Sequence, residues 1–350
     1  MALTSARCSS TRTAPALPSV FTVHHPAPCV RGHGAGCIMP DGHAVGTWQA
    51  ATGSELPASG ADGGSSGTSA DGPVRYDEDM QIAVGGIRIG YDQDGSGPPV
   101  VLIHGFPVNR TMWRPQVAAL RDRFTVITPD LRGFGESDLP TGTVTMDTYA
   151  ADVLGVLDAL GHQRFVLGGL SMGGYVAFRI IAAAPARVRA LIMADSRAAP
   201  DADEARQRRY AAVTRIQHEG PDGFLRDFLG PLVGATTKAQ RPQVAEAMRQ
   251  ITGTPPAQSL TAALVAIAER PDSRPLLPSI AVPTLVVVGE EDTVTPPAES
   301  RAIASAVPRA RLATIPAAGH FSNLEVPEAF NRVVREFLEE LPYPRASIGT

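Results

Sequence analysis

A serine flanked by glycines is the feature of this sequence that points most directly to chemistry. Residues 169–173 read Gly-Leu-Ser-Met-Gly, with the strand-like run 164–167 before them and the small, apolar stretch 175–184 after them. This pattern is typical of a nucleophile elbow, in which a strand turns sharply into a helix. Side chains beside the serine would collide with the neighbouring strand and helix, which explains the glycines. The pattern predicts that Ser171 is a nucleophile.

A serine hydroxyl needs a base, and the base needs a carboxylate that orients it. In folds with this elbow the chain order is serine, acid, histidine. Residues 283–288 read as a buried strand, and the turn after them carries Asp292. Residues 311–315 read as a last short strand, and the loop beyond them carries His320. We therefore expect Asp292 to be the acid and His320 to be the general base.

Acyl transfer also needs backbone N–H groups that stabilise the developing oxyanion. Residues 104–107, His-Gly-Phe-Pro, follow a predicted strand and form a glycine turn that aims an N–H into the site. Because Pro107 has no N–H, the expected donor from this loop is Phe106. The second expected donor is Met172, at the start of the elbow helix, where the helix dipole favours an anion.

These motifs resemble those of the α/β-hydrolases, in particular the cofactor-free esterase, lactonase and perhydrolase group. The resemblance extends from about residue 81 to residue 341, and the matching segments are 104–107, 130–137, 169–174, 289–297 and 319–321, all in family order. The elbow and the Gly-Phe-Pro turn are most similar to those of 3-oxoadipate enol-lactonase-like hydrolases. Chloroperoxidase-like perhydrolases and carboxylesterases share the same motifs. The motifs therefore do not determine the substrate, which depends on residues of the lid and pocket.

Two differences separate the chain from other hydrolases that it resembles. Haloalkane dehalogenases and epoxide hydrolases carry an aspartate at the elbow, where this chain has Ser171. Proline iminopeptidase-like peptidases have a tryptophan after the nucleophile and an acidic lid, whereas this chain has Met172 and an arginine-rich stretch at 206–215.

Asp195 is the alternative acid, because it follows the strand predicted at 188–194 and some members of this fold keep their acid there. The Gly-Glu-Glu-Asp turn at the family position favours Asp292.

His104 ends a buried strand and is expected to be a structural hydrogen-bonding residue. Trp113 and Phe321 are candidate walls of the substrate pocket, with ordinary core positions as the alternative.

The turn at residues 130–137, with Asp130, Gly133, Gly135 and Ser137, is expected to support the oxyanion loop structurally.

Alternating strands and helices predict a mostly parallel, doubly wound sheet with its chemistry at the carboxyl ends of the strands. The expected fold class is α/β, an α/β-hydrolase fold with a helical lid inserted after strand 6. Within the insertion, residues 203–219, 239–251 and 260–269 read as helices. The predicted division is a core at 79–197, a lid at 198–275, a second core part at 276–341 and a tail at 342–350.

Residues 1–78 are rich in Pro, Gly, Ser, Thr and Ala, and we expect disorder there. The acid-free stretch up to Met39 faintly resembles a transit peptide, although a start-site artefact, with Met80 directly before the first strand, is an equal alternative. The sequence lacks the apolar core of a secretory signal, and a cytoplasmic location is the expectation.

The three cysteines, Cys8, Cys29 and Cys37, all precede the predicted core, so no disulfide framework is expected in that core.

Composition narrows the choice of function. A net charge of −4 with no basic stripe argues against nucleic-acid binding, and no apolar run reaches the roughly 18 residues needed to span a bilayer. No cluster has metal-ligand spacing, so we expect neither a metal nor a cofactor. The sequence carries no signal for an oligomeric state.

The predicted function is a serine hydrolase that cleaves a small carboxylic ester or lactone, its small-molecule substrate, through an acyl-enzyme on Ser171. The alternatives are a ligand receptor or partner-binding module on the same scaffold, and a C–C bond hydrolase or perhydrolase within the family.

Overall fold

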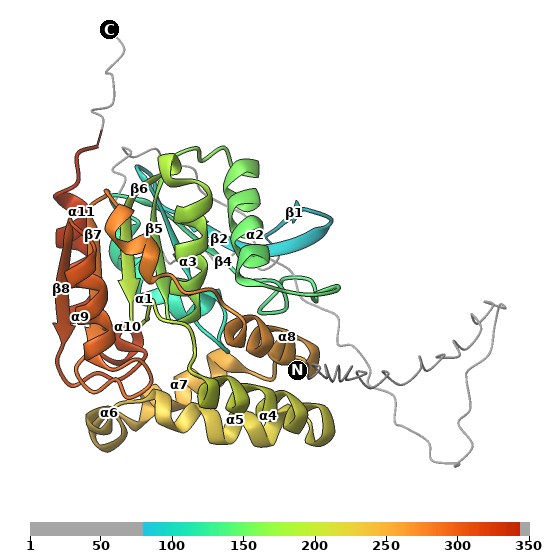
Figure 1. The fold of residues 1–350 in the computed structure, drawn as a ribbon. Coiled ribbons are helices and arrows are strands. Elements are labelled where there is room, and N and C mark those ends of the chain that lie inside the picture. Colours follow the sequence, from blue (N-terminus) through green and yellow to red (C-terminus); the bar gives the residue numbers. More distant parts are fainter. Residues whose placement is uncertain (1–79, 344–350) are drawn as a thin grey trace, which may run out of the picture. The chain divides into compact units, whose positions relative to one another are not determined.

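The central element of the structure is an eight-stranded sheet (Figure 1). The computed structural model describes residues 80–343, so the predicted disordered segment 1–78 and most of the predicted tail 342–350 lie outside the described residues. The strands are β1 (Gln81–Val84), β2 (Ile87–Asp94), β3 (Pro99–Ile103), β4 (Thr125–Pro129), β5 (Phe165–Leu170), β6 (Val188–Ala194), β7 (Thr284–Gly289) and β8 (Ala310–Ile315). Their order across the sheet is β1-β2-β4-β3-β5-β6-β7-β8.

Strand direction changes only at one edge of the sheet. β1 pairs antiparallel with β2, and β2 pairs antiparallel with β4, whereas every pair from β4 through β8 is parallel. Parallel strands require crossover connections, and helices supply them here. The carboxyl ends of six strands, β4, β3 and β5 to β8, therefore meet at the same edge of the sheet, where the predicted site residues follow them.

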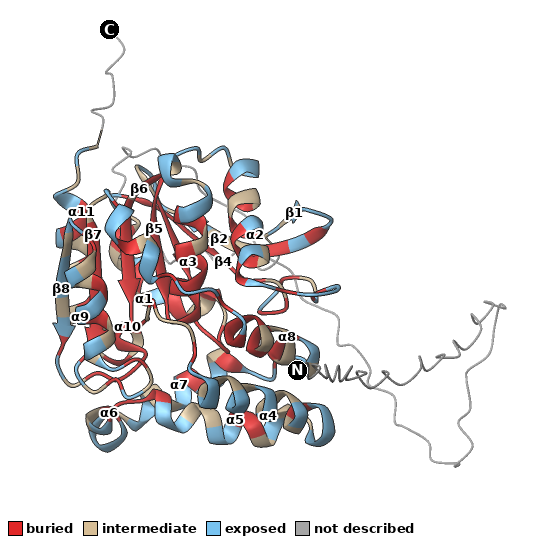
Figure 2. Ribbon diagram, in the orientation of Figure 1, coloured by how far each residue is buried: buried red, intermediate tan, exposed pale blue. Residues whose placement is uncertain are grey.

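The two faces of the sheet bury alternate side chains of the same strand. In β3, Val101 and Ile103 belong to one buried cluster, while Val100 and Leu102 belong to the other. This alternation is the period of two expected of an extended strand that is covered on both faces. Figure 2 shows the resulting band of buried residues through the centre of the sheet.

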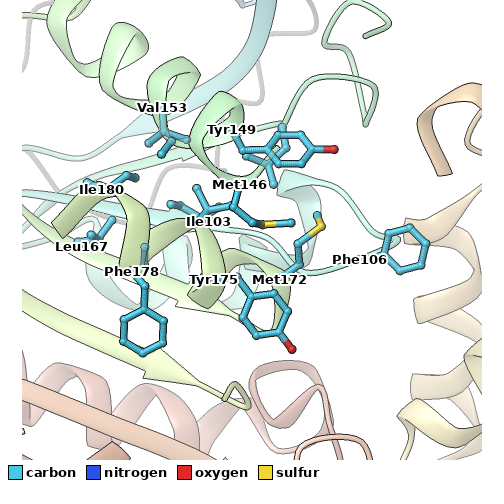
Figure 3. Packing of buried hydrophobic residues seen from close by; sticks show 14 of the residues in the cluster. Ile103, Phe106, Met146, Tyr149, Val153, Leu167, Met172, Tyr175, Phe178 and Ile180 are labelled. Atoms are coloured by element: carbon cyan, nitrogen blue, oxygen red, sulfur yellow. The ribbon is translucent and has the colours of Figure 1, made fainter. Parts of the chain in front are cut away.

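Helices cover both faces. The main-body helices and short 3-10 turns are η1 (Arg110–Trp113), α1 (Arg114–Leu120), α2 (Met146–Ala159), α3 (Met172–Ala183), η2 (Pro185–Arg187), η4 (Arg274–Ser279), α9 (Pro297–Ala306), α10 (Ser322–Glu325) and α11 (Pro327–Glu339). Residues of α2, α3 and α9 share the cluster of Val101, and residues of α1 and α11 share the cluster of Val100. Figure 3 shows how Val153, Leu167 and Ile180 gather between α2, α3 and the sheet.

An all-helical insertion follows β6. It contains α4 (Asp203–Glu219), α5 (Pro221–Leu229), η3 (Gly230–Leu232), α6 (Ala235–Gln240), α7 (Pro242–Thr252) and α8 (Ala257–Ala268). The Asn109 side chain, after β3, donates a 2.9 Å hydrogen bond to the carbonyl of Ile251, and the Thr236 N–H donates a 2.8 Å bond to Glu291, after β7. The insertion therefore packs against loops at the carboxyl ends of the strands (Figure 1).

The predicted fold class is confirmed, but two details of the predicted helices were wrong. The helix expected at 239–251 is two helices, because Pro242 starts a new one and forces Arg241 out of helical geometry, at φ −135° and ψ 54°. The helix α5 was not predicted at all. No helix between residues 80 and 343 is long and apolar enough to cross a membrane.

Candidate active site

Ser171 stands at a sharp turn between β5 and α3. Its backbone has φ 53° and ψ −113°, a left-handed conformation that a serine adopts only under strain. A Cβ at Gly169 would lie 2.3 Å from the carbonyl oxygen of Gly173, and a Cβ at Gly173 would lie 2.2 Å from that of Ile103 in β3. Both glycines are therefore required by close backbone contacts, as the sequence pattern predicted.

His320 lies directly against the serine. Its Nε2 is 2.8 Å from Ser171 Oγ, and only 2% of the residue is exposed. The loop after β8 carries it, and its backbone N–H donates a 3.0 Å hydrogen bond to the carbonyl of Leu232 in the insertion. The backbone of the loop at His320 is thus held by the insertion, while the ring contacts residues of the core.

Asp292 completes the chain of contacts. Its Oδ2 is 2.9 Å from His320 Nδ1 and accepts a 2.6 Å hydrogen bond from the Thr295 hydroxyl. Its Oδ1 accepts the N–H groups of Val294 and Thr295 at 2.8 and 2.9 Å. Burial acts to raise the pKa of this carboxyl, but the neighbouring His320 and these hydrogen bonds outweigh it, so the pKa is lowered. Asp292 therefore favours the ionised form.

Asp195, the alternative acid, forms its hydrogen bonds with residues other than His320. Its Oδ1 accepts the N–H of Gly289 at 2.8 Å, and its Oδ2 accepts the hydroxyl of Ser322 at 2.5 Å. It is completely buried, and burial together with the charge of Asp292 raises its pKa well above the ordinary value. The residue thus joins the ends of β6 and β7 to the start of α10, without a hydrogen bond to the His320 ring.

The two expected oxyanion donors lie on either side of Ser171, Phe106 on the loop after β3 and Met172 at the first residue of α3. A Cβ at Gly105 would lie 3.5 Å from the Ser171 Cβ, so the loop that carries Phe106 runs beside the serine. Phe106 and Met172 are both buried, and neither backbone N–H has a hydrogen-bond acceptor among the residues that the structure describes. Buried N–H groups normally have an acceptor, so these two are free to take one from a ligand.

His104 serves the architecture of this loop. Its Nε2 accepts the Leu131 N–H at 2.9 Å, and its Nδ1 lies 2.8 Å from the carbonyl of Gly105, which assigns the proton to Nδ1. Burial lowers its pKa to about 4. His104 is therefore a neutral hydrogen-bonding residue at neutral pH, the role expected from the sequence.

The turn at 130–137 supports the same loop. The carboxylate of Asp130 accepts the backbone N–H of Arg110 at 2.7 Å and that of Glu136 at 2.9 Å, and it also pairs with the Arg110 guanidinium. Ser137 donates a 2.8 Å bond to the Asp130 carbonyl. A buried ion pair thus connects this turn to η1, which directly follows the Phe106 loop.

A cavity of about 490 Å³ is lined mostly by residues of the insertion, and neither Ser171 nor His320 is among its lining residues. Its lining includes Phe228 and Leu232 from the insertion and Val294 from the Asp292 loop. Trp113 and Phe321 are not among its lining residues. Both are fully buried in the cluster on the α1 and α11 face, so the structure places them in core positions.

Three residues of the site were not predicted from the sequence. Thr295 holds the Asp292 carboxylate, Leu232 holds the His320 loop, and Ser196 donates a 2.9 Å hydrogen bond to the Ser171 carbonyl. Thr295 lies within the turn already assigned to the acid, so that turn was the available signal. Within residues 80–343, no group of three or more histidine, cysteine or acidic side chains is arranged to hold a metal ion.

Comparison with known proteins supports the resemblance seen in the motifs. The family model of the alpha/beta hydrolase fold matches residues 98–327. The 3-oxoadipate enol-lactonase 1 of Acinetobacter baylyi is 30% identical over 254 residues, which cover 70% of this chain and 90% of that protein.

Solved structures agree with this result. A thermophilic esterase from Thermogutta terrifontis is 42% identical with a TM-score of 0.71, and the match covers 74% of this chain and 96% of that one. The enol-lactonase from Burkholderia xenovorans LB400 is 31% identical with a TM-score of 0.70, and the match covers 74% and 100%. The chain belongs to the alpha/beta hydrolase fold family.

Proposed function

We propose that the protein is a serine hydrolase that cleaves a small carboxylic ester or lactone through an acyl-enzyme on Ser171. The observation that carries the proposal is the continuous chain of contacts from Ser171 Oγ to His320 Nε2, at 2.8 Å, and from His320 Nδ1 to Asp292 Oδ2, at 2.9 Å. Relatives that match most of the chain are named as an enol-lactonase and an esterase, both of which act on ester bonds.

The tautomer of the histidine follows from its neighbours. An ionised Asp292 can only accept a hydrogen bond, so the ring proton resides on Nδ1 and leaves the Nε2 lone pair facing Ser171. In the acylation step, Nε2 takes the hydroxyl proton while Oγ attacks the carbonyl carbon of the substrate. The imidazolium that forms is stabilised by the Asp292 carboxylate.

The negative charge that develops on the carbonyl oxygen is directed to the N–H groups of Phe106 and Met172. Because these groups are already fixed by the backbone, they need no reorganisation as the charge forms. Collapse of the tetrahedral intermediate breaks the bond to the alcohol oxygen, which takes the proton from His320 Nε2. In a lactone the alcohol stays tethered to the acyl group.

Deacylation repeats the same steps with water. His320 Nε2 accepts a proton from water, whose oxygen attacks the acyl carbon, and the proton is then returned to Ser171 Oγ as the bond to the acyl group breaks. The products are a carboxylic acid and an alcohol, or a hydroxy or oxo acid from a lactone. The residues that carry these steps are Ser171, His320 and Asp292.

A panel of p-nitrophenyl esters from acetate to hexanoate, together with a fluorophosphonate probe, tests this proposal. We expect steady turnover of at least one ester, and probe labelling that peptide mapping assigns to Ser171. A chain that neither turns over the esters nor reacts with the probe would instead be a binding module on a hydrolase scaffold. Mapping of the label to another residue would contradict the assignment of the nucleophile.

A further inference from the structure

The carbonyl of Ser171 accepts one hydrogen bond more than the start of α3 supplies. The N–H groups of Gly174 and Tyr175 donate to it at 2.9 and 3.3 Å, as expected for the first turn of a helix. The hydroxyl of Ser196, which follows β6, donates a further bond of 2.9 Å. Only 1% of Ser196 is exposed, so bulk water does not compete for this contact. A side chain from outside the elbow therefore joins the helix in holding this carbonyl.

The same segment holds the other backbone group of the nucleophile. The N–H of Ser171 donates a 3.0 Å hydrogen bond to the carbonyl of Ala194, the last residue of β6. Ser171 is thus fixed on both sides of its Cα by residues 194 and 196. Asp195, between them, has φ 43°, a left-handed backbone that is strained for a residue other than glycine. The strained turn after β6 therefore holds the backbone of the elbow in place.

Helix α3 leaves room for the Ser196 hydroxyl. A Cβ at Gly174 would lie 2.4 Å from Ser196 Oγ and 2.7 Å from Ser196 Cβ, distances at which one of the two residues must move. Glycine is unfavourable inside a helix, and this close contact explains why one stands in the first turn of α3. Gly174 thus permits the contact between Ser196 and the elbow, whereas Gly169 and Gly173 clear space for the backbone.

The carbonyl that Ser196 holds belongs to the same peptide as the N–H of Met172, one of the two expected oxyanion donors. The bond between Ser171 and Met172 is trans, since the cis bond found in residues 80–343 precedes Pro107. In a planar trans peptide the C=O and N–H point in opposite directions, so a fixed carbonyl also fixes the direction of the N–H. A hydrogen bond to the carbonyl oxygen polarises the peptide as well, which makes its N–H a stronger donor.

We infer that Ser196 is a positioning residue for oxyanion stabilisation. Its hydroxyl holds and polarises the peptide whose N–H, at Met172, binds the negative charge of the tetrahedral intermediate. That charge develops only after the substrate has bound, so the hydroxyl acts on kcat rather than on substrate binding. The inference rests on the proposed function and adds to it a residue outside the chain of contacts from Ser171 to Asp292.

Ser196→Ala tests the inference in steady-state kinetics. The two N–H groups of α3 still satisfy the carbonyl, so we expect the variant to fold. Its kcat on the preferred p-nitrophenyl ester should fall about tenfold, with KM little changed. This loss is smaller than the roughly 10²- to 10³-fold that follows removal of an oxyanion donor itself. The pH at which kcat/KM reaches half of its maximum should not move, because the Ser196 hydroxyl donates to the elbow carbonyl and not to the acid or the base.

A trifluoromethyl ketone supplies a readout that is specific to the oxyanion. Ser171 Oγ adds to its carbonyl carbon, His320 Nε2 takes the hydroxyl proton, and the carbonyl oxygen becomes an oxyanion, which a proton from solvent converts to a hemiketal hydroxyl at low pH. Carbon-13 NMR of the labelled carbonyl carbon during a pH titration gives the pKa of that hydroxyl. We expect Ser196→Ala to raise this pKa by about one pH unit and to weaken ketone binding about tenfold, since the two changes measure the same loss of anion stabilisation.

Two further variants accompany this measurement. Ser196→Cys places a weak donor at the same position, so its losses should lie between those of the unmodified protein and of Ser196→Ala, and it serves if the alanine variant does not fold. Ser259→Ala is the matched control. It removes a hydroxyl of a residue that is also 1% exposed but has no hydrogen-bond partner among the described residues. It should change neither kcat nor the pKa of the hemiketal.

The unmodified protein gives a test without any variant. With 15N-methionine labelling, the amide proton of Met172 should shift downfield when the ketone oxyanion forms, and the absence of this shift would overturn the inference. A folded Ser196→Ala or Ser196→Cys variant that keeps the unmodified hemiketal pKa, or that loses only KM, would overturn it too. If the unmodified protein neither hydrolyses the esters nor forms the ketone adduct, the proposed function itself fails, and the inference fails with it.

Discussion

His320 Nδ1 lies 2.9 Å from Asp292 Oδ2, within a carboxylate site that three further hydrogen bonds hold in place. Asp195 is buried close enough for the charge of Asp292 to raise its pKa, yet its own carboxyl oxygens bind Gly289 and Ser322. The two acids therefore occupy different positions in the site. Asp292 faces the histidine, and Asp195 connects the end of β7 to the start of α10.

Substituting the two acids should give unequal losses. Asp292→Asn should lower kcat on the order of 10⁴-fold, because an amide in place of the carboxylate stabilises the wrong histidine tautomer. Asp195→Asn should be mild, since the amide oxygen can accept the Gly289 N–H while the amide nitrogen donates to the Ser322 hydroxyl oxygen, so that both contacts are kept. Steady-state kinetics on the preferred p-nitrophenyl ester compares them.

Asp195→Ala serves as the control for the structural role of Asp195. It removes both hydrogen bonds, so it should lower thermal stability and activity more than Asp195→Asn does. Reversed results, with Asp195→Asn inactive and Asp292→Asn nearly normal, would place the catalytic acid after β6.

The Thr295 hydroxyl should contribute to catalytic activity because it holds the carboxylate of Asp292 in place. Thr295→Val removes the 2.6 Å hydrogen bond to Oδ2 while it keeps the shape of the side chain, and we expect kcat/KM to fall about tenfold, the scale of one hydrogen bond to a charged group. Thr295→Ser keeps the hydroxyl and should stay near the unmodified value. Equal losses in the two variants would show that packing, rather than the hydroxyl, is what matters.

His104 should make the fold sensitive to acid. Its folded-state pKa of about 4 lies below the ordinary value of 6.5, because burial disfavours the imidazolium. Between these values the unfolded chain binds the proton and the folded chain does not. The contribution of neutral His104 to the free energy of unfolding is therefore fully present above about pH 6.5 and is lost as the pH falls toward 4. The full effect is on the order of 3 kcal/mol.

Urea unfolding of the unmodified protein and of His104→Gln at several pH values between 4 and 7 measures this effect. The variant is expected to be less stable at pH 7, because glutamine fits the two hydrogen bonds of His104 less well. The difference in free energy of unfolding between the two proteins should shrink as the pH falls. The variant has no imidazole to protonate at this position, and the two proteins share all other titrating groups. A constant difference across this range would contradict the assigned role of His104.

Much of this architecture could be predicted because it depends on local signals. The strand 188–194 and the helix 203–219 were predicted with the bounds that the structure gives, since period-two and helical patterns are strong there. Ser171, Asp292 and His320 were selected because each follows a predicted strand, and parallel strands bring those ends together.

The remaining features depend on contacts between distant segments. Whether Asp292 or Asp195 faces the histidine is decided by loop geometry beyond the strands, which leaves no periodic signal. The exposed, arginine-rich face of α4 gives no hint that Arg209 reaches a buried aspartate. Trp113 and Phe321 are large aromatic residues, which line substrate pockets as well as cores, and only packing places them in the core.

The most direct test of the central claim is the activity of Ser171→Ala on an ester that the unmodified protein hydrolyses. We predict a loss of several orders of magnitude in kcat, with unchanged circular dichroism, because the remaining groups alone supply only about 10³- to 10⁴-fold over the reaction in water. Near-normal turnover by the folded variant would contradict the covalent mechanism and the role of Ser171.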